Sequence, residues 1–293
     1  MTPVLYGNTL AEQEARLATD PLLARFQRSR TELAADPFRP RYHFTAPLGG
    51  LNDPNGLCFW QGRWHLFYQA TPTEESGWHW GHAVSTDLIH WHDLPYAICP
   101  GPEKGSWSGA TLVEPDRVIA MYHGSPIGNM VAVASDPLLL NWEKIGDGPV
   151  IPMLEAGYFT PLSAAATTRM PGNPLPVGAV HSVYDPCIWK KAGMYFALSG
   201  GALPHGPSGR RLRAQFLYRS ADLKNWEYLH PFVEGDVFGL PGDDGACPYF
   251  WPIGDRHILL HLSHMSGGKY LLGDYDTRRD KFVVTSGGNF TFG

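Results

Sequence analysis

The chain has 293 residues, 43% of them hydrophobic, and a formal net charge of −5 made of both signs. This composition supports a sizeable core and excludes a basic face for nucleic acid. The sequence holds no apolar run long enough to cross a membrane, and its start does not resemble a secretory signal. The four cysteines are far apart in apolar surroundings, which indicates buried thiols rather than disulfides. We therefore expect a cytoplasmic protein with neither nucleic-acid nor membrane partners.

Residues 1–40 differ from the rest because they are rich in helix-forming residues. Helices are predicted at Leu10–Leu17 and Pro21–Leu33. Asp20 is expected to cap the second helix, with Pro21 at its first position. We therefore expect residues 1–40 to form a helical arm that packs against the main domain, residues 41–293.

Residues 41–293 hold a repeated pattern of short strands and turns. The chain has 33 Gly and 26 Pro, which favour short strands joined by turns over long helices. An Asp-Leu-x-x-Trp turn occurs at residues 85–91 and 220–226, with a degenerate copy at 135–142 and a weaker echo at 274–282. The same turn after each group of strands indicates four repeats of one structural unit.

Two strands are expected before each copy of this turn. The predicted pairs are 64–68 with 80–85, 118–123 with 130–134, 195–199 with 215–219, and 257–263 with 270–275. Units of about 50 residues with about four strands each are typical of a β-propeller. A single blade cannot bury its own faces, so we predict an all-β domain whose blades stack around an axis. A β-sandwich with accidental repeats is the alternative.

Asp53 lies in a stretch, residues 49–57, that is rich in Gly, Asn and Pro. Those residue types favour turns. Residues 58–69 predict two short strands around a turn at Gln61 and Gly62, so Asp53 is expected on a rigid turn at the mouth of a sheet. A carboxylate at that place can be catalytic, can bind a metal, or can cap the turn.

Polar residues recur where the first strand of each unit is expected. They are Asn52 and Asp53 in the first unit, Ser106 and Ser108 in the second, Asp185 in the third, and Asp243 and Asp244 in the fourth. Because the inner strands of a propeller line its central channel, we expect a ring of acids among aromatic residues there. Such a ring suits a sugar, since aromatic faces stack on its C–H surfaces and carboxylates bind its hydroxyls.

Several segments, taken in order, resemble one known family. They are residues 52–56 (Asn-Asp-Pro-Asn-Gly), 66–69 (Leu-Phe-Tyr-Gln) and 80–85 (Trp-Gly-His-Ala-Val-Ser). With Asp87, Leu88 and Trp91, they look like glycoside hydrolase family 32, the invertase, inulinase and levanase group. Residues 106–110 are similar to the family's Phe-Ser-Gly-Ser segment. Residues 184–186 fall where the family has Arg-Asp-Pro, and residues 246–248 where it has Glu-Cys-Pro.

The resemblance implies a five-bladed propeller that hydrolyses or transfers β-fructofuranosyl groups with retention. It implies that Asp53 is the nucleophile and that Asp185 binds sugar hydroxyls and stabilises the transition state. The expected sugar contacts are Asn52, Gln69, Trp80, Trp107, Ser108, Tyr184 and Ala246, with Trp80 and Trp107 open to a packing role instead. No cofactor or metal is expected, because His79 and His82 fall on opposite faces of a predicted strand.

The sequence departs from the family pattern at three points. Ala246 stands where the acid/base Glu is expected, and Tyr184 stands where the family has Arg. The chain also ends after about four blades, so a fifth blade and a C-terminal sandwich are not seen. An open propeller would leave bare strand edges. We expect a fragment, or an edge covered by the helical arm or by a partner chain such as a second copy.

Three explanations of Ala246 stay open. It can be an engineered knockout, it can mark a sugar-binding propeller without turnover, or the acid can have moved to Asp244. Positions 244 and 246 share one face of a strand, so Asp244 could reach the same channel, whereas Asp243 would point away. A related five-bladed enzyme acting on arabinosides or xylosides, or a fructosyltransferase, is the remaining alternative.

Overall fold

The computed structural model describes residues 4–40, 42–74, 76–153, 183–203, 212–240, 243 and 245–290. The chain divides into two compact units. The first holds residues 1–126 and 131–148, and the second holds residues 127–130 and 149–293. Neither of the two helices within the described ranges is long and apolar enough to span a membrane.

The two predicted helices are confirmed. They are α1, Leu10–Leu17, and α2, Pro21–Leu33. Thr9 and Glu12 form a capping box at the start of α1. Asp20 caps α2 as predicted, because its Oδ1 accepts hydrogen bonds from the backbone N–H groups of Leu22 and Leu23.

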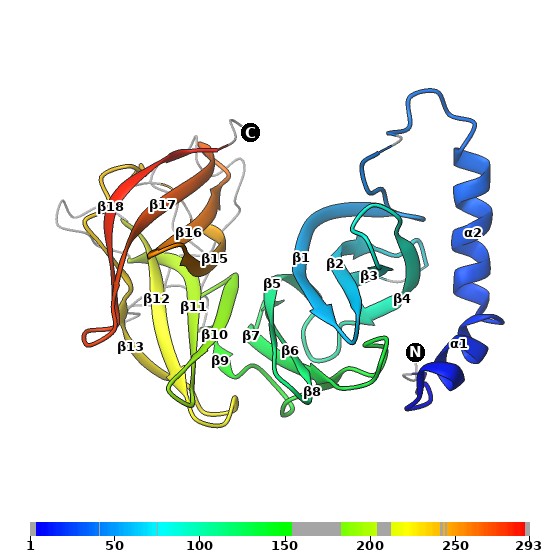
Figure 1. Cartoon of the computed structure of the whole chain (residues 1–293), viewed down its shortest axis with the longest axis horizontal. Helices are drawn as coiled ribbons and strands as arrows, with labels where there is room; N and C mark the ends of the chain where they lie inside the picture. Colours follow the sequence, from blue (N-terminus) through cyan, green and yellow to red (C-terminus); the bar gives the residue numbers. More distant parts are fainter. Residues whose placement is uncertain are drawn as a thin grey trace. The chain divides into compact units, whose positions relative to one another are not determined.

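The helical arm packs against the first sheet of its own unit, alongside strand β4, His92–Ile98 (Figure 1). Phe26 is fully buried and makes an edge contact with the ring of Tyr96, with 5.8 Å between the centroids. Arg30 donates from Nε and Nη2 to the two carboxylate oxygens of Asp93, at 2.5 and 2.7 Å. An apolar anchor and a two-point ion pair therefore hold α2 on the sheet.

The first unit contains the first two blades, apart from the start of strand β7 and strand β9. The first blade has the order β1-β2-β3-β4, with β1 at Gly50–Trp60, β2 at Arg63–Thr71 and β3 at His79–Ser85. The predicted turn joins β1 to β2, and both of its residues have positive φ, 44° at Gln61 and 82° at Gly62. In the second blade the order is β5-β6-β7-β8, and β9 pairs with β7. Its strands are β5 (Gly105–Val113), β6 (Val118–Ser125), β7 (Gly128–Ala134), β8 (Glu143–Lys144) and β9 (Ile151–Pro152).

The second unit holds the third and fourth blades. The third blade is β10 (Pro186–Lys191), β11 (Met194–Leu203), β12 (Leu212–Ser220) and β13 (Glu227–Pro231). The fourth is β15 (Ala246–Ile253), β16 (Arg256–Ser263), β17 (Gly267–Asp276) and β18 (Lys281–Asn289), with β14 (Val233–Glu234) parallel to β18. All eight predicted strand segments lie in strands, and the four repeats are four blades. The first strands of neighbouring blades lie side by side in each unit, β1 by β5 and β10 by β15.

Three copies of the repeated Asp-Leu-x-x-Trp turn share one backbone feature. Its central leucine is left-handed in every copy, with φ of 65° at Leu88, 51° at Leu139 and 66° at Leu223. This conformation costs energy for a residue with a Cβ, so hydrogen bonds must hold it. In the first copy Asp87 Oδ1 accepts from the backbone N–H groups of Ile89 and His90. The hydrogen bond between the side chains of Asp87 and His90, together with these two backbone bonds, lowers the pKa of Asp87.

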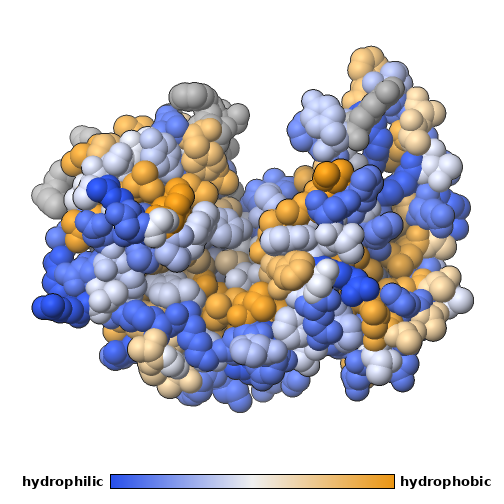
Figure 2. Space-filling model, in the orientation of Figure 1, coloured by the Kyte–Doolittle hydropathy of each residue, from blue (hydrophilic) through white to orange (hydrophobic). Residues whose placement is uncertain are grey.

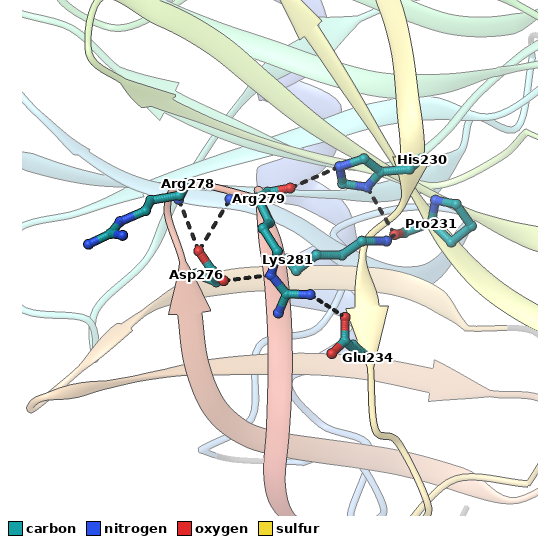
Figure 3. A network of polar contacts seen from close by, with 7 residues as sticks. All are labelled: His230, Pro231, Glu234, Asp276, Arg278, Arg279 and Lys281. Atoms are coloured by element: carbon teal, nitrogen blue, oxygen red, sulfur yellow. Dashed lines mark hydrogen bonds and ion pairs between the residues drawn. The ribbon is translucent and has the colours of Figure 1, made fainter.

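A polar network joins the turn between β17 and β18 to residues of β13 and β14 (Figure 3). Asp276, in the weakest copy of the repeat, accepts from two backbone N–H groups in the turn between β17 and β18. The guanidinium of Arg279 bridges Asp276 at 2.7 Å and Glu234 at 3.0 Å, and His230 Nε2 lies 3.1 Å from the Arg279 carbonyl oxygen. The segment that follows β13 is thereby tied to this turn.

The surface mixes polar and apolar side chains. Figure 2 shows hydrophilic and hydrophobic residues interspersed over the visible face. Such a mixture is usual, because apolar atoms supply more than half of the accessible surface of an ordinary folded protein.

Candidate active site

Asp53 lies in strand β1 and not on a turn, so that expectation was wrong. The register between β1 and β2 breaks between Leu51 and Pro54, which places Asp53 in a β-bulge. A bulge redirects a side chain and bends its strand. Gly56 is needed in this irregular strand for two reasons. Its φ is 48°, and an added Cβ would lie 2.6 Å from the methyl group of Thr111 on β5.

Two buried side chains hold one oxygen of the Asp53 carboxylate. Asp53 Oδ2 accepts from the hydroxyl of Ser108 at 2.7 Å and from Nε2 of Gln69 at 3.2 Å. Gln69 also donates to Ser108 Oγ at 2.7 Å and accepts at Oε1 from the Asn52 side chain at 3.0 Å. Asp53 itself is only half-buried. The structure thus brings together four predicted site residues and presents a fixed carboxylate to solvent.

Ser108 reaches Asp53 from a second bulge. The register between β5 and β6 breaks between Ser106 and Gly109, on either side of Trp107 and Ser108. An added Cβ at Gly109 would lie 2.1 Å from the carbonyl oxygen of Met121, so only glycine fits there. The bulge therefore sets the direction of the Ser108 hydroxyl.

The two candidate tryptophans have different environments. Trp107 is 42% exposed, so part of its side chain is accessible to a ligand. Trp80 is 0% exposed, packs on Phe67 and Tyr122, and donates from its indole N–H to the carbonyl oxygen of Trp107 at 2.7 Å. The expected sugar contact of Trp80 is corrected, because its faces are covered by other rings. Trp80 takes the packing role that was the alternative.

In the second unit, Asp185 lies immediately before β10 and is 7% exposed. Its Oδ2 accepts from the backbone N–H of Cys247 at 3.0 Å. Cys247 has a left-handed φ of 46°, and the register of β15 with β16 breaks between Ala246 and Tyr249. A third bulge thus aims a backbone donor at a predicted site carboxylate.

The chain around Asp185 is fixed by its own backbone. The N–H of Gly200 donates to the Asp185 carbonyl oxygen at 2.9 Å, and Tyr184 N–H donates to the Gly200 carbonyl oxygen at 3.1 Å. The hydroxyl of Ser199 donates to the Tyr184 carbonyl oxygen at 2.8 Å. The Tyr184 side chain, predicted to touch the sugar, is almost completely buried.

Position 246, where the resemblance places the acid/base Glu, is an alanine and carries no proton donor. Ala246 is 1% exposed and opens β15. Asp243 is buried and accepts from the hydroxyls of Ser263 at 2.8 Å and Ser266 at 2.6 Å. Asp244, the candidate for a relocated acid, lies outside the described residues.

Cys247 was not predicted as a site residue. Its backbone N–H donates to Asp185 Oδ2, which no side-chain pattern reports, and its thiol lies 3.5 Å from the same oxygen. The available signal was Pro248, because a proline inside a strand indicates a bulge or an edge.

In the described part of the chain, no three His, Cys, Asp or Glu side chains are grouped as metal ligands would be. His82 pairs with His65, their nearest ring nitrogens 3.0 Å apart. Both are fully buried, and desolvation lowers the pKa of His65 to about 4.

Residues 43–291 match the family model described as the N-terminal domain of glycosyl hydrolases family 32. The chain is 31% identical over 247 residues to sucrose-6-phosphate hydrolase of Escherichia coli, covering 78% of this chain and 44% of that protein. It is 28% identical over 258 residues to levanase of Bacillus subtilis, covering 82% of this chain and 34% of that protein. The chain spans about half or less of the length of these relatives.

Two solved structures share the fold. Fructan 1-exohydrolase IIa of Cichorium intybus, a Glu-to-Gln variant with 1-kestose, aligns with a TM-score of 0.65 and 28% identity over 84% of this chain and 46% of that one. The β-fructofuranosidase of Bombyx mori, an Asp-to-Ala mutant in complex with sucrose, aligns with a TM-score of 0.64 and 25% identity, over 92% and 56%. With the four blades, these similarities confirm the predicted all-β propeller class.

Proposed function

Because this chain belongs to glycosyl hydrolase family 32, we propose that it binds β-fructofuranosides and cleaves them with retention, with Asp53 as the nucleophile. One observation carries the proposal: Asp53 is a half-exposed carboxylate with one oxygen held by Ser108 and Gln69. A nucleophile gains most from being held in one orientation before the substrate arrives. The family and the names of its relatives, which act on sucrose 6-phosphate and levan, support the substrate class.

The other site residues receive roles around the fructosyl ring. Trp107, which is 42% exposed, is the aromatic side chain proposed to contact the C–H surface of the sugar. Asp185, with one oxygen on the Cys247 N–H, binds sugar hydroxyls. A crystal structure with a short fructo-oligosaccharide tests each role, through the contacts that Asp53, Trp107 and Asp185 make with the sugar.

The missing acid limits the proposed reaction. Retaining hydrolysis needs a second carboxyl group that protonates the leaving oxygen and then activates water. Ala246 supplies none, and Asp243 is engaged by Ser263 and Ser266. The first half-reaction is therefore expected with leaving groups that need no proton, and the fructosyl-enzyme is expected to accumulate. Sugar binding without turnover is the second candidate function, and Ala246 is the observation that favours it.

An activated aryl β-fructofuranoside separates these functions. Asp53 attacks the anomeric carbon, an ester bond forms, and the aryl oxygen leaves as a phenolate. We expect a burst of phenolate equal to the enzyme concentration, followed by slow turnover. Azide, which needs no base, releases the sugar as a fructosyl azide with retained configuration. A protein that binds 1-kestose but gives no burst is a binding propeller, and the enzymatic proposal fails.

Asp244 is tested with a natural substrate. If it has taken over the acid role, the parent protein hydrolyses sucrose, and Asp244→Asn removes that activity by about 100-fold or more. The first turnover of the activated fructoside is the control, because this step needs no acid and the rate of phenolate release in it should not change.

A further inference from the structure

A buried acid beside the site has no role in the proposed reaction. The side chain of Glu103 is completely buried, and its Oε1 accepts from Lys144 Nζ at 2.5 Å and from the Tyr122 hydroxyl at 2.9 Å. The Ser106 hydroxyl donates to the same oxygen at 3.3 Å. A buried ion pair is weak evidence for stability, because desolvation offsets much of the attraction. A position-setting role is therefore worth considering for this cluster.

The cluster is built to keep one arrangement. Lys144 is 22% exposed and also donates to the carbonyl oxygen of Cys99 at 2.7 Å. Burial and the neighbouring Glu103 raise the pKa of Tyr122 well above its usual value of 10, so Tyr122 stays a neutral donor. Lys144 and Tyr122, which lie outside β5, thus hold the Glu103 carboxylate independently of Ser106.

Ser106 connects this cluster to the bulge that carries Ser108. Ser106 is fully buried, and its N–H donates to the carbonyl oxygen of Trp78 at 2.8 Å. The bulge begins directly after it and ends at Gly109. At the next residue, the Trp80 indole N–H donates to the carbonyl oxygen of Trp107. The two residues of the bulge are therefore clamped at both ends.

We infer that Glu103 and Ser106 are positioning residues: through the β5 bulge they fix Ser108 so that its hydroxyl meets Asp53. The inference rests on the proposed role of Asp53 as nucleophile. A hydrogen bond of 2.7 Å to a carboxylate tolerates little displacement of its donor, and a shift of about 1 Å in a reacting constellation can cost about 100-fold in rate. Neither residue touches the substrate, so both act through Ser108.

Two substitutions separate positioning from stability. Ser106→Ala and Tyr122→Phe each remove one hydroxyl donor to Glu103 Oε1 from a fully buried side chain, but only Ser106 directly precedes the bulge in the chain. With the activated fructoside we expect Ser106→Ala to lower the rate constant of the phenolate burst about tenfold or more, while the substrate concentration that gives half the maximal burst rate stays within about twofold. Tyr122→Phe should leave both burst parameters within about twofold of the parent, since Lys144 still holds Glu103. Both variants should lower Tm.

Crystal structures of both variants complete the test. The inference requires that Ser108 Oγ moves out of hydrogen-bond reach of Asp53 in Ser106→Ala and stays in reach in Tyr122→Phe. It is overturned if the bond survives in Ser106→Ala, or if Tyr122→Phe loses as much activity as Ser106→Ala. A parent protein without a phenolate burst would overturn the proposed function alone, and the Ser108 to Asp53 distance would still decide the positioning role.

Discussion

Asp185 accepts a hydrogen bond at 3.0 Å from the backbone N–H of Cys247, the residue that follows Ala246. This bond fixes the start of β15 beside a site carboxylate. Cys247, which makes this bond, has a left-handed φ of 46°. A carboxyl group introduced at position 246 would therefore start next to Asp185, on a backbone that the bond already orients.

Ala246→Glu should convert the site into one with both carboxyl groups that retention needs. We expect sucrose or 1-kestose hydrolysis to rise by about 100-fold or more, the usual size of general acid–base catalysis. Product release measured by chromatography gives the rate. Ala246→Gln is the matched control, because it has the same shape but cannot donate a carboxylic proton. Equal gains in the two variants would contradict an acid/base role for this position.

Asp53→Asn should abolish the phenolate burst with the activated fructoside. The amide keeps the size of the carboxylate and can stay within the Ser108 and Gln69 contacts, but it is no nucleophile. Tm should change little, since Asp53 is half-buried and its bulge remains. Residual activity within about tenfold of the parent, which is about 1.4 kcal/mol in the barrier, would remove Asp53 from the role.

The sequence predicted the blades better than the site. The strand pairs and the repeated turn follow from local sequence patterns. Leu88 and Leu223, which occupy the same position in two copies of the turn, are both left-handed. The bulge at Asp53 was missed because its residues favour turns, while pairing with β2 keeps them in a strand. The burial of Trp80 could not be predicted either, because Phe67 and Tyr122 come from two other strands.

The ion pair between Arg30 and Asp93 should stabilise the docking of the helical arm. Arg30→Met leaves the largely buried Asp93 without its two-point donor, so we expect a loss of about 2 kcal/mol in the free energy of unfolding. Arg25→Met is the control on the same helix, because its pair with Glu74 is exposed and should contribute less than about 1 kcal/mol. Urea unfolding at pH 7 measures both. Similar losses would argue against a special role for Arg30.

The buried pair of His65 and His82 should make stability fall with acid. Burial, helped by Arg63 and opposed by Asp136, lowers the pKa of His65 from 6.5 to about 4. Between these two pH values the unfolded chain binds a proton that the folded chain rejects, so the free energy of unfolding rises with pH across this window. For His65 alone we expect about 2 kcal/mol less stability at pH 5 than at pH 7. Burial also lowers the pKa of His82, which acts in the same direction.

Urea unfolding at pH 7 and pH 5 tests this with two histidine substitutions. His65→Gln is neutral at both pH values, so the stability difference between them should shrink by about 2 kcal/mol relative to the parent. His92→Gln, at an exposed position on β4, should leave that difference within about 0.5 kcal/mol of the parent. Because each variant is compared with itself at two pH values, any packing loss cancels. An unchanged difference in His65→Gln would show that the proton is taken up elsewhere.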